Sequence, residues 1–145
     1  MQRFTQLIVW QRGHALALAI YESTKTFPRE ELFGLTSQLR RASVSVSCNI
    51  AEGSKRRHRP DYARFLNIAE ASAAEVESLL MLSRDLGYLN QHKASALLGE
   101  ADAVARMLST LRRKVELMER NELNRNRCSQ LVPLSSDLST LNSKL

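Results

Sequence analysis

The sequence predicts an all-α protein, folded as an antiparallel up-down-up-down four-helix bundle. Four long segments repeat apolar residues at steps of three and four, which is the spacing of one face of an α-helix. The 145 residues include only 5 Gly and 3 Pro, a composition that suits helices better than sheets with many turns. The connections between the segments are short, and short connections favour antiparallel neighbours. We expect one domain, with the bundle over residues 1–120 and a polar tail over 121–145.

The first segment is expected to be a helix from about Thr5 to Phe27. A stripe at helical spacing consists of Leu7, Trp10, His14, Leu18 and Tyr21. Val9, Leu16 and Ile20 widen this stripe beyond one face, and a helix of that kind packs against more than one neighbour. The additional neighbour could be a second subunit. Histidine on such a face is usually a packing residue, so we expect His14 to have no ligand.

The second segment, residues 35–55, fits two periodicities. Apolar and serine residues alternate from Ala42 to Ile50, as in a strand, but Leu39, Ala42 and Val46 also fall at helical spacing. Because the chain offers no partner strand, a lone strand would leave its backbone groups unsatisfied. We therefore predict a helix, with Gly53 marking a helix end or a close backbone approach.

The third segment is expected to begin at Pro60, a favourable first helical residue, and to end near Leu86 before Gly87. The fourth has a near-heptad apolar pattern and is expected from Gln91 to about Arg120. Beyond that residue the composition shifts to Asn and Ser. The tail 121–145 is thus expected to be disordered or to form a short docked helix. Such a helix would have an apolar face of Leu134, Leu138, Leu141 and Leu145.

The sequence contains no recognisable catalytic, metal or cofactor site. The histidines are His14, His58 and His92, and the residues three positions before them are Gln11, Lys55 and Leu89. The Glu-x-x-His pairs of a di-iron bundle are therefore missing. The GxSxG, GxxxxGK and GxGxxG motifs are also missing. Cys48 and Cys128 have neither disulfide-framework nor zinc-site spacing. We expect a protein that is not an enzyme and needs no cofactor or metal.

The expected location is the cytoplasm, without contact with a membrane. The first residues do not form a signal peptide, and the longest apolar run, from Ala15 to Tyr21, is too short to span a bilayer. Free thiols at Cys48 and Cys128 suit a reducing compartment.

Basic residues gather in and after the second segment and are the predicted nucleic-acid-binding site. They are Arg40, Arg41, Lys55, Arg56, Arg57, Arg59 and Arg64. Seven cations against Glu52 and Asp61 leave a local excess of +5, in a chain of formal net charge +6. Long cations near a helix end can reach phosphates, and arginine can bind them with two parallel hydrogen bonds. An alternative remains open, in which Arg56 and Arg57 cap the negative end of the helix. Because few aromatic residues are free to stack on bases, binding should favour the backbone over the sequence.

Several motifs together resemble the four-helix-bundle proteins encoded in 23S ribosomal RNA intervening sequences. The motifs are VWQ at Val9–Gln11, IY at Ile20–Tyr21, FP at Phe27–Pro28, FGLTSQLRRA at Phe33–Ala42, NIAEG at Asn49–Gly53, RFLNIA at Arg64–Ala69 and LGYL at Leu86–Leu89. The resemblance covers roughly Phe4 to Arg120. It departs from the family pattern at Cys48, at EASAAE over Glu70–Glu75, and in the tail.

The resemblance implies a closed bundle that is commonly a homopentamer with a basic exterior. A related branch, the accessory variability proteins of diversity-generating retroelements, associates with reverse transcriptase and nucleic acid. The family supplies no catalytic residues. The expected partners are therefore other copies of this chain and nucleic acid, and the alternative is a scaffold that binds a protein such as a reverse transcriptase. The resemblance also favours a helix for the second segment and a subunit interface on the first.

Overall fold

The computed structural model describes residues 3–131, which form α-helices joined by short turns. The α-helices are α1 (Ile8–Ser23), α2 (Leu35–Gly53), α3 (Arg59–Asp85) and α4 (Gln91–Leu131). Short 3-10 helices are η1 (Phe4–Gln6), η2 (Thr24–Thr26) and η3 (Arg29–Glu31). No strand occurs between residues 3 and 131, which confirms the all-α class and the helical interpretation of the second segment. The predicted leucine face of the tail lies outside the described residues.

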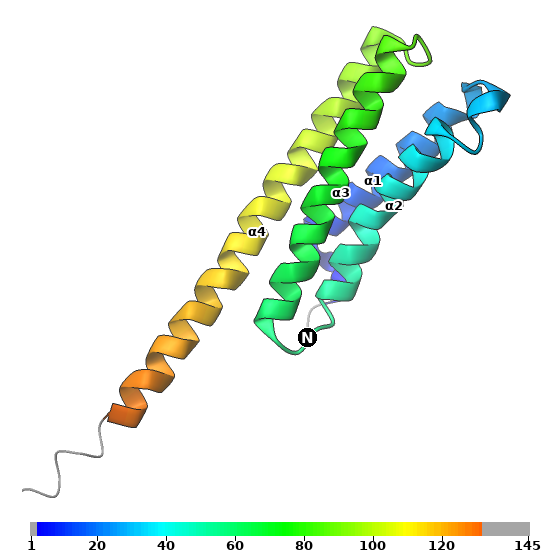
Figure 1. Ribbon diagram of the computed structural model, residues 1–145. Helices are drawn as coiled ribbons and strands as arrows, with labels where there is room; N and C mark the ends of the chain where they lie inside the picture. The colour runs from blue at the N-terminus through cyan, green and yellow to red at the C-terminus, as the bar shows by residue number, and fades with distance from the viewer. Residues whose placement is uncertain (1–2, 132–145) are drawn as a thin grey trace, which may run out of the picture.

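The four α-helices pack around a shared core. Helix α1 packs against α2 and α4, and α3 also packs against α2 and α4. The α2–α3 connection lies at one end of the bundle and the α3–α4 connection at the other (Figure 1). The up-down-up-down order remains a prediction, which these connections support.

The core consists of two apolar clusters. Leu16, Ile20, Leu39 and Leu80 belong to one of them, together with Phe27 of the α1–α2 connection. The other contains Val46, Ile50, Leu66, Val104 and Leu108. Burying a side chain of this size contributes about 1.5–3 kcal/mol. Small residues such as Ala69, Ala73 and Ala101 are fully buried among them and permit close helix contacts.

The apolar stripe of Leu7, Trp10, His14, Leu18 and Tyr21 is not the buried face of α1. The buried residues of this helix are Val9, Gly13, Leu16, Ala17 and Ile20. By contrast, Leu18 is 60% exposed and His14 is exposed as well. Gly13 lies against α2, where a Cβ atom at this position would be in van der Waals contact with Val46 Cγ1 at 3.4 Å. The small residue Gly13 of α1 therefore faces α2, and the larger aromatic residues of α1 lie outside the core.

The helix ends follow the sequence signals at α3, whereas α1 covers Ile8–Ser23 and is shorter than the expected span from about Thr5 to Phe27. Helix α3 begins at Arg59 with Pro60 in its first turn, and Gly87 after it has a φ of 80°, the left-handed conformation that favours glycine. The expected end of the fourth helix near Arg120 is wrong, because α4 continues to Leu131. The residues from Asn121 to Leu131 are therefore helical and do not belong to an irregular tail.

Candidate nucleic-acid interface

Between residues 3 and 131, His, Cys, Asp and Glu side chains form no group of three or more that could hold a metal ion. None of the helices in that range combines the length and the apolar character needed to cross a membrane. The basic residues are the remaining candidate site.

The structure places the seven predicted basic residues at two separate positions. Arg40 and Arg41 lie in the first half of α2, whereas Lys55 follows its C-terminal end. Fifteen residues at 1.5 Å each correspond to about 22 Å along the helix axis. Arg56, Arg57 and Arg59 accompany Lys55, and Arg64 lies in the second turn of α3. The structure therefore does not join all seven residues into one surface.

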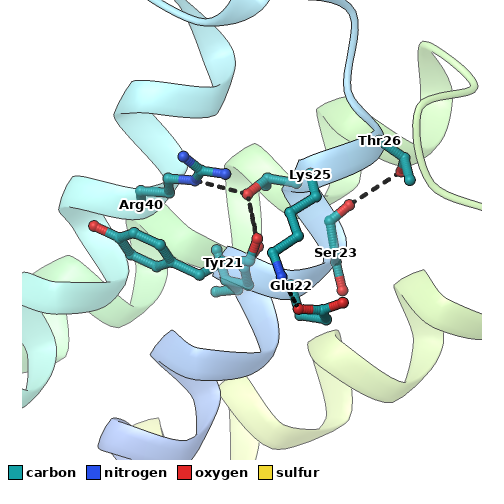
Figure 2. Close-up of polar contacts among 8 residues, drawn as sticks. Tyr21, Glu22, Ser23, Lys25, Thr26 and Arg40 are labelled. Atoms are coloured by element: carbon teal, nitrogen blue, oxygen red, sulfur yellow. Dashed lines mark hydrogen bonds and ion pairs between the residues drawn. The ribbon is translucent and has the colours of Figure 1, made fainter.

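Arg40 has a structural role at the other end of the bundle. Its Nε donates a hydrogen bond to Thr24 Oγ1 at 2.8 Å, and its guanidinium lies over the Tyr21 ring, 4.8 Å from the centroid. Figure 2 shows Arg40 beside this ring, where α2 meets the end of α1. Thr24 Oγ1 in turn donates to Ile20 O at 2.8 Å. Arg40 thus connects two helices, while Arg41 is exposed.

The remaining five basic residues surround the connection between α2 and α3. Arg56 pairs with Glu52 and lies 4.6 Å from the Phe65 ring centroid. The capping alternative gains no support for Arg56, whose ion pair is with this carboxylate. Lys55, Arg57 and Arg64 are exposed and form no ion pair with any described carboxylate.

Helix α4 completes this end of the molecule. Arg59 Nη2 contacts Glu122 Oε1 at 2.8 Å, so the α2–α3 connection is fastened to α4. A shallow cleft between them is lined by Arg57 and His58 on one side and by Asn126 on the other. Nearby, Arg112 bridges Glu70 of α3 and Glu116 of α4. Hydrogen bonds to Glu70 and Glu116 raise the pKa of Arg112 above its ordinary value, which keeps the guanidinium charged.

The formal charge of the chain is concentrated at this end. We define the basic end as residues 52–64 and 112–131. It contains eleven Lys and Arg against five Asp and Glu, an excess of six. The rest of the chain contains ten of each and is formally neutral. The sequence pattern indicated only the α2–α3 part, because the charges on α4 join it only once α4 is known to extend past that connection.

A second exposed surface is apolar and lies between α1 and α2. This α1–α2 groove is lined by Phe4, Trp10, His14, Leu18, Tyr21 and Val44, among others. The Trp10 and His14 rings stack with centroids 5.0 Å apart, and the Phe4 and Trp10 rings meet in a T-shaped arrangement with centroids 5.1 Å apart. Most of the apolar stripe predicted on the first segment, from Trp10 to Tyr21, therefore forms an outer apolar surface.

Comparison with known proteins gives a family match for the sequence and a similar solved structure for the fold. Residues 5–110 match the model of a family described as 23S rRNA-intervening sequence protein. A protein with unknown function from the S23 ribosomal protein family of Bacteroides thetaiotaomicron has a similar fold, with a TM-score of 0.66 and 22% identity. That match covers 72% of this chain and 97% of the other. No curated protein matches the sequence. The family match ends before residues 112–131, so the α4 part of the basic end lies beyond it.

Proposed function

Because the chain belongs to the 23S rRNA-intervening sequence protein family, we propose that it is a non-enzymatic, homo-oligomeric protein that binds the backbone of RNA or DNA. The basic end is the proposed binding surface. The single observation that carries this proposal is the distribution of charge, since the whole formal excess of six lies at one end of the molecule. A polyanion gains affinity there through the release of its condensed counterions, and such affinity falls steeply with salt.

The individual side chains support contacts with phosphates more than contacts with bases. Lys55 and Arg57 are exposed at the α2–α3 connection and are free to reach a phosphate. The nearby aromatic rings are less free, because Arg56 covers Phe65 and the ring of Tyr62 is half-buried. Stacking on bases, which is worth about 1–3 kcal/mol per base, has little support at this position.

Self-association is the second part of the proposal, with the α1–α2 groove as the subunit interface. Leu18 is 60% exposed and Tyr21 44% exposed in the single chain. Contiguous apolar surface of this kind marks interaction sites. We propose a homopentamer, in which five basic ends would carry a formal excess of +30, five times the six of one chain.

A second candidate function is that of an adaptor for a protein partner such as a reverse transcriptase. The observation that favours it is the α1–α2 connection, where Leu32 is 50% exposed and Phe33 is 92% exposed. This apolar tip lies at the opposite end of the bundle from the basic end, so it could bind a protein without blocking nucleic acid.

The test of nucleic-acid binding is a matched pair of charge reversals. One variant carries Lys55→Glu and Arg57→Glu at the basic end. The control carries Arg29→Glu and Lys93→Glu, which change the net charge equally at the opposite end, where both side chains are exposed. Fluorescence anisotropy with a labelled RNA hairpin, single-stranded DNA and duplex DNA measures affinity at low and near-physiological salt.

The expected result is weaker binding for the first variant alone. For duplex DNA, the slope of log K against log salt should fall by about 0.9 for each lost phosphate contact. If both variants bind as the wild type does, or if the wild type binds none of the three probes at low salt, the nucleic-acid function is wrong. The adaptor function would then be the one to pursue.

A further inference from the structure

The C-terminal part of α4 extends past the rest of the bundle. Residues from Asn121 to Leu131 continue the helix first beside the α2–α3 connection, where Glu122 and Asn126 flank it, and then beyond it (Figure 1). Eleven residues correspond to about 16 Å of helix. Every residue from 121 to 130 is exposed. A helix that is polar on all sides gains little from packing, and its exposed surface is available to a polar partner.

Charges on this half of α4 are sorted by face. At about 100° per residue, every cation except the ion-paired Arg112 falls within about 80° of the direction of Leu117, and the carboxylates lie at least about 100° from it. The cations are Arg113, Lys114, Arg120, Arg125 and Arg127, and the carboxylates are Glu116, Glu119 and Glu122. Buried residues such as Leu108 and Val115 lie on the carboxylate side, toward the core. The cations therefore share an outward face.

Two of the three inner carboxylates are ion-paired, and none of the outer cations is. Glu116 pairs with Arg112 and Glu122 pairs with Arg59, both at 2.8 Å. None of the five outer cations forms an ion pair within residues 3–131. The helix dipole favours cations in the last turn of a helix. This preference explains the position of Arg127 near the end of α4 and, less well, the position of Arg125. It does not account for Arg113 or Lys114, which lie more than four turns before the end of α4.

The same face carries side-chain amides. Asn121 and Asn124 lie within about 40° of the direction of Leu117, between the arginines. Arginine and asparagine form the paired hydrogen bonds that distinguish guanine and adenine in the major groove of DNA. That groove, about 12 Å wide, admits an α-helix. The major groove of an A-form RNA helix is too narrow to be read by side chains.

We propose that the outward face of α4 from Arg113 to Arg127 binds duplex DNA by lying in its major groove. The proposal rests on the proposed function and deepens it, because the α4 face would contact base edges as well as the phosphates that line the groove, beside the phosphate contacts of the α2–α3 connection. The positive charge of this face favours a polyanion as its partner. DNA is favoured over RNA because only the major groove of DNA is wide enough to admit the helix.

The test compares two variants that each lose three positive charges. The first carries Arg120→Gln, Arg125→Gln and Arg127→Gln, substitutions that preserve helix propensity. The control carries Lys25→Gln, Arg29→Gln and Lys93→Gln at the opposite end, all exposed. Affinity is measured by anisotropy for a 20-bp DNA duplex and for an RNA duplex of the same sequence, and circular dichroism verifies that both variants are folded. At about 0.15 M salt, losing three contacts should weaken DNA binding by about 10²-fold, with the control unchanged.

A footprint locates the helix in the groove. Dimethyl sulfate methylates guanine N7, an acceptor at the major-groove edge. The wild-type protein should protect guanines of the bound DNA, and Asn121→Ala with Asn124→Ala should reduce that protection while the salt slope stays the same. Binding without protection would overturn the major-groove placement.

The outcomes separate this inference from the function on which it rests. If the charge reversals at Lys55 and Arg57 abolish binding but the triple α4 variant binds normally, the proposed function stands and the α4 inference fails. If neither variant differs from its control, both fail. If the RNA duplex binds as tightly as the DNA duplex, DNA is the wrong occupant. A change in particle mass without a change in affinity would identify this face as a contact between copies of the chain.

Discussion

At the scale of single residues, the contact between α2 and α3 depends on a missing methyl group. A Cβ built on Gly53 would lie 2.7 Å from Phe65 Cβ and 3.0 Å from Tyr62 Cδ2. The first of these atoms is attached directly to the backbone of α3, so it cannot rotate away. The two helices can approach this closely only while residue 53 has no side chain.

Gly53→Ala should therefore destabilise the fold, although alanine is the better helix former. We expect the free energy of unfolding to fall by about 1–3 kcal/mol, the usual cost of overpacking a core. Gly99→Ala is the matched control, since nothing lies within 4 Å of its Cβ position in α4. That control should gain up to about 1 kcal/mol of helix propensity. Urea denaturation measures the stability change of each variant. Equal stabilisation of the two variants would contradict the close contact between α2 and α3 at Gly53.

The sequence indicated which residues matter at Gly53 and in the basic cluster, but it did not indicate which residues they contact. The sequence indicated that Gly53 could mark a close approach, which the structure confirms, and it contained no sign that Phe65 lies opposite. It likewise indicated a basic cluster without showing that Arg40 binds Thr24 or that Arg59 pairs with Glu122. Those contacts join residues far apart in the sequence, and local spacing carries no information about them.

At the scale of elements, α4 consists of a packed half and a projecting half. The packed half contributes Ala101, Val104 and Leu108 to the core, each fully buried. The projecting half is exposed from residue 121 to 130 and is held to the bundle by the pair between Arg59 and Glu122. An exposed ion pair of this kind contributes at most about 1 kcal/mol.

Ending the chain after Arg120 should leave the bundle nearly as stable as the full chain. We expect the free energy of unfolding to change by less than about 1 kcal/mol, because the removed residues 121–130 bury no apolar side chain and supply only that one exposed pair. Duplex DNA affinity should fall at the same time. Thermal and urea unfolding would test the first expectation, and a loss of several kcal/mol would show that the projecting half supports the core.

The elements also show which sequence signals were reliable. Pro60 and Gly87 marked helix ends because each restricts or permits one backbone conformation locally. The spacing of residues in α1 did not determine which side meets the core, because both of its sides are apolar. The end of α4 was missed because an Asn- and Ser-rich segment resembles an irregular tail, whereas here it continues a helix already nucleated by the core.

At the scale of the whole molecule, the protein has one basic end and an apolar groove along its side. The groove between α1 and α2 leaves Leu18 and Tyr21 exposed in the single chain. The excess positive charge lies at the α2–α3 end. Copies that associate through the grooves would each retain a basic end, so assembly would multiply the charge without covering it.

Leu18→Glu should dissociate the proposed oligomer while leaving the subunit folded. A carboxylate in an apolar interface loses its hydration without gaining a partner, whereas Leu18 is already 60% exposed in the single chain. Met81→Glu is the matched control, because Met81 is 45% exposed on α3, outside the groove. Light scattering should give a lower mass for the first variant alone. Equal masses for both variants and the wild type would show that the groove is not the interface.

The length of α4 also affects how the protein diffuses. Its 41 residues span about 61 Å, whereas the 19 residues of α2 span about 28 Å. A body with such an overhang experiences more friction in solution than a sphere of equal mass. It should therefore elute early from a sizing column and tumble with more than one rotational correlation time. Elution volume alone would then overstate the number of subunits.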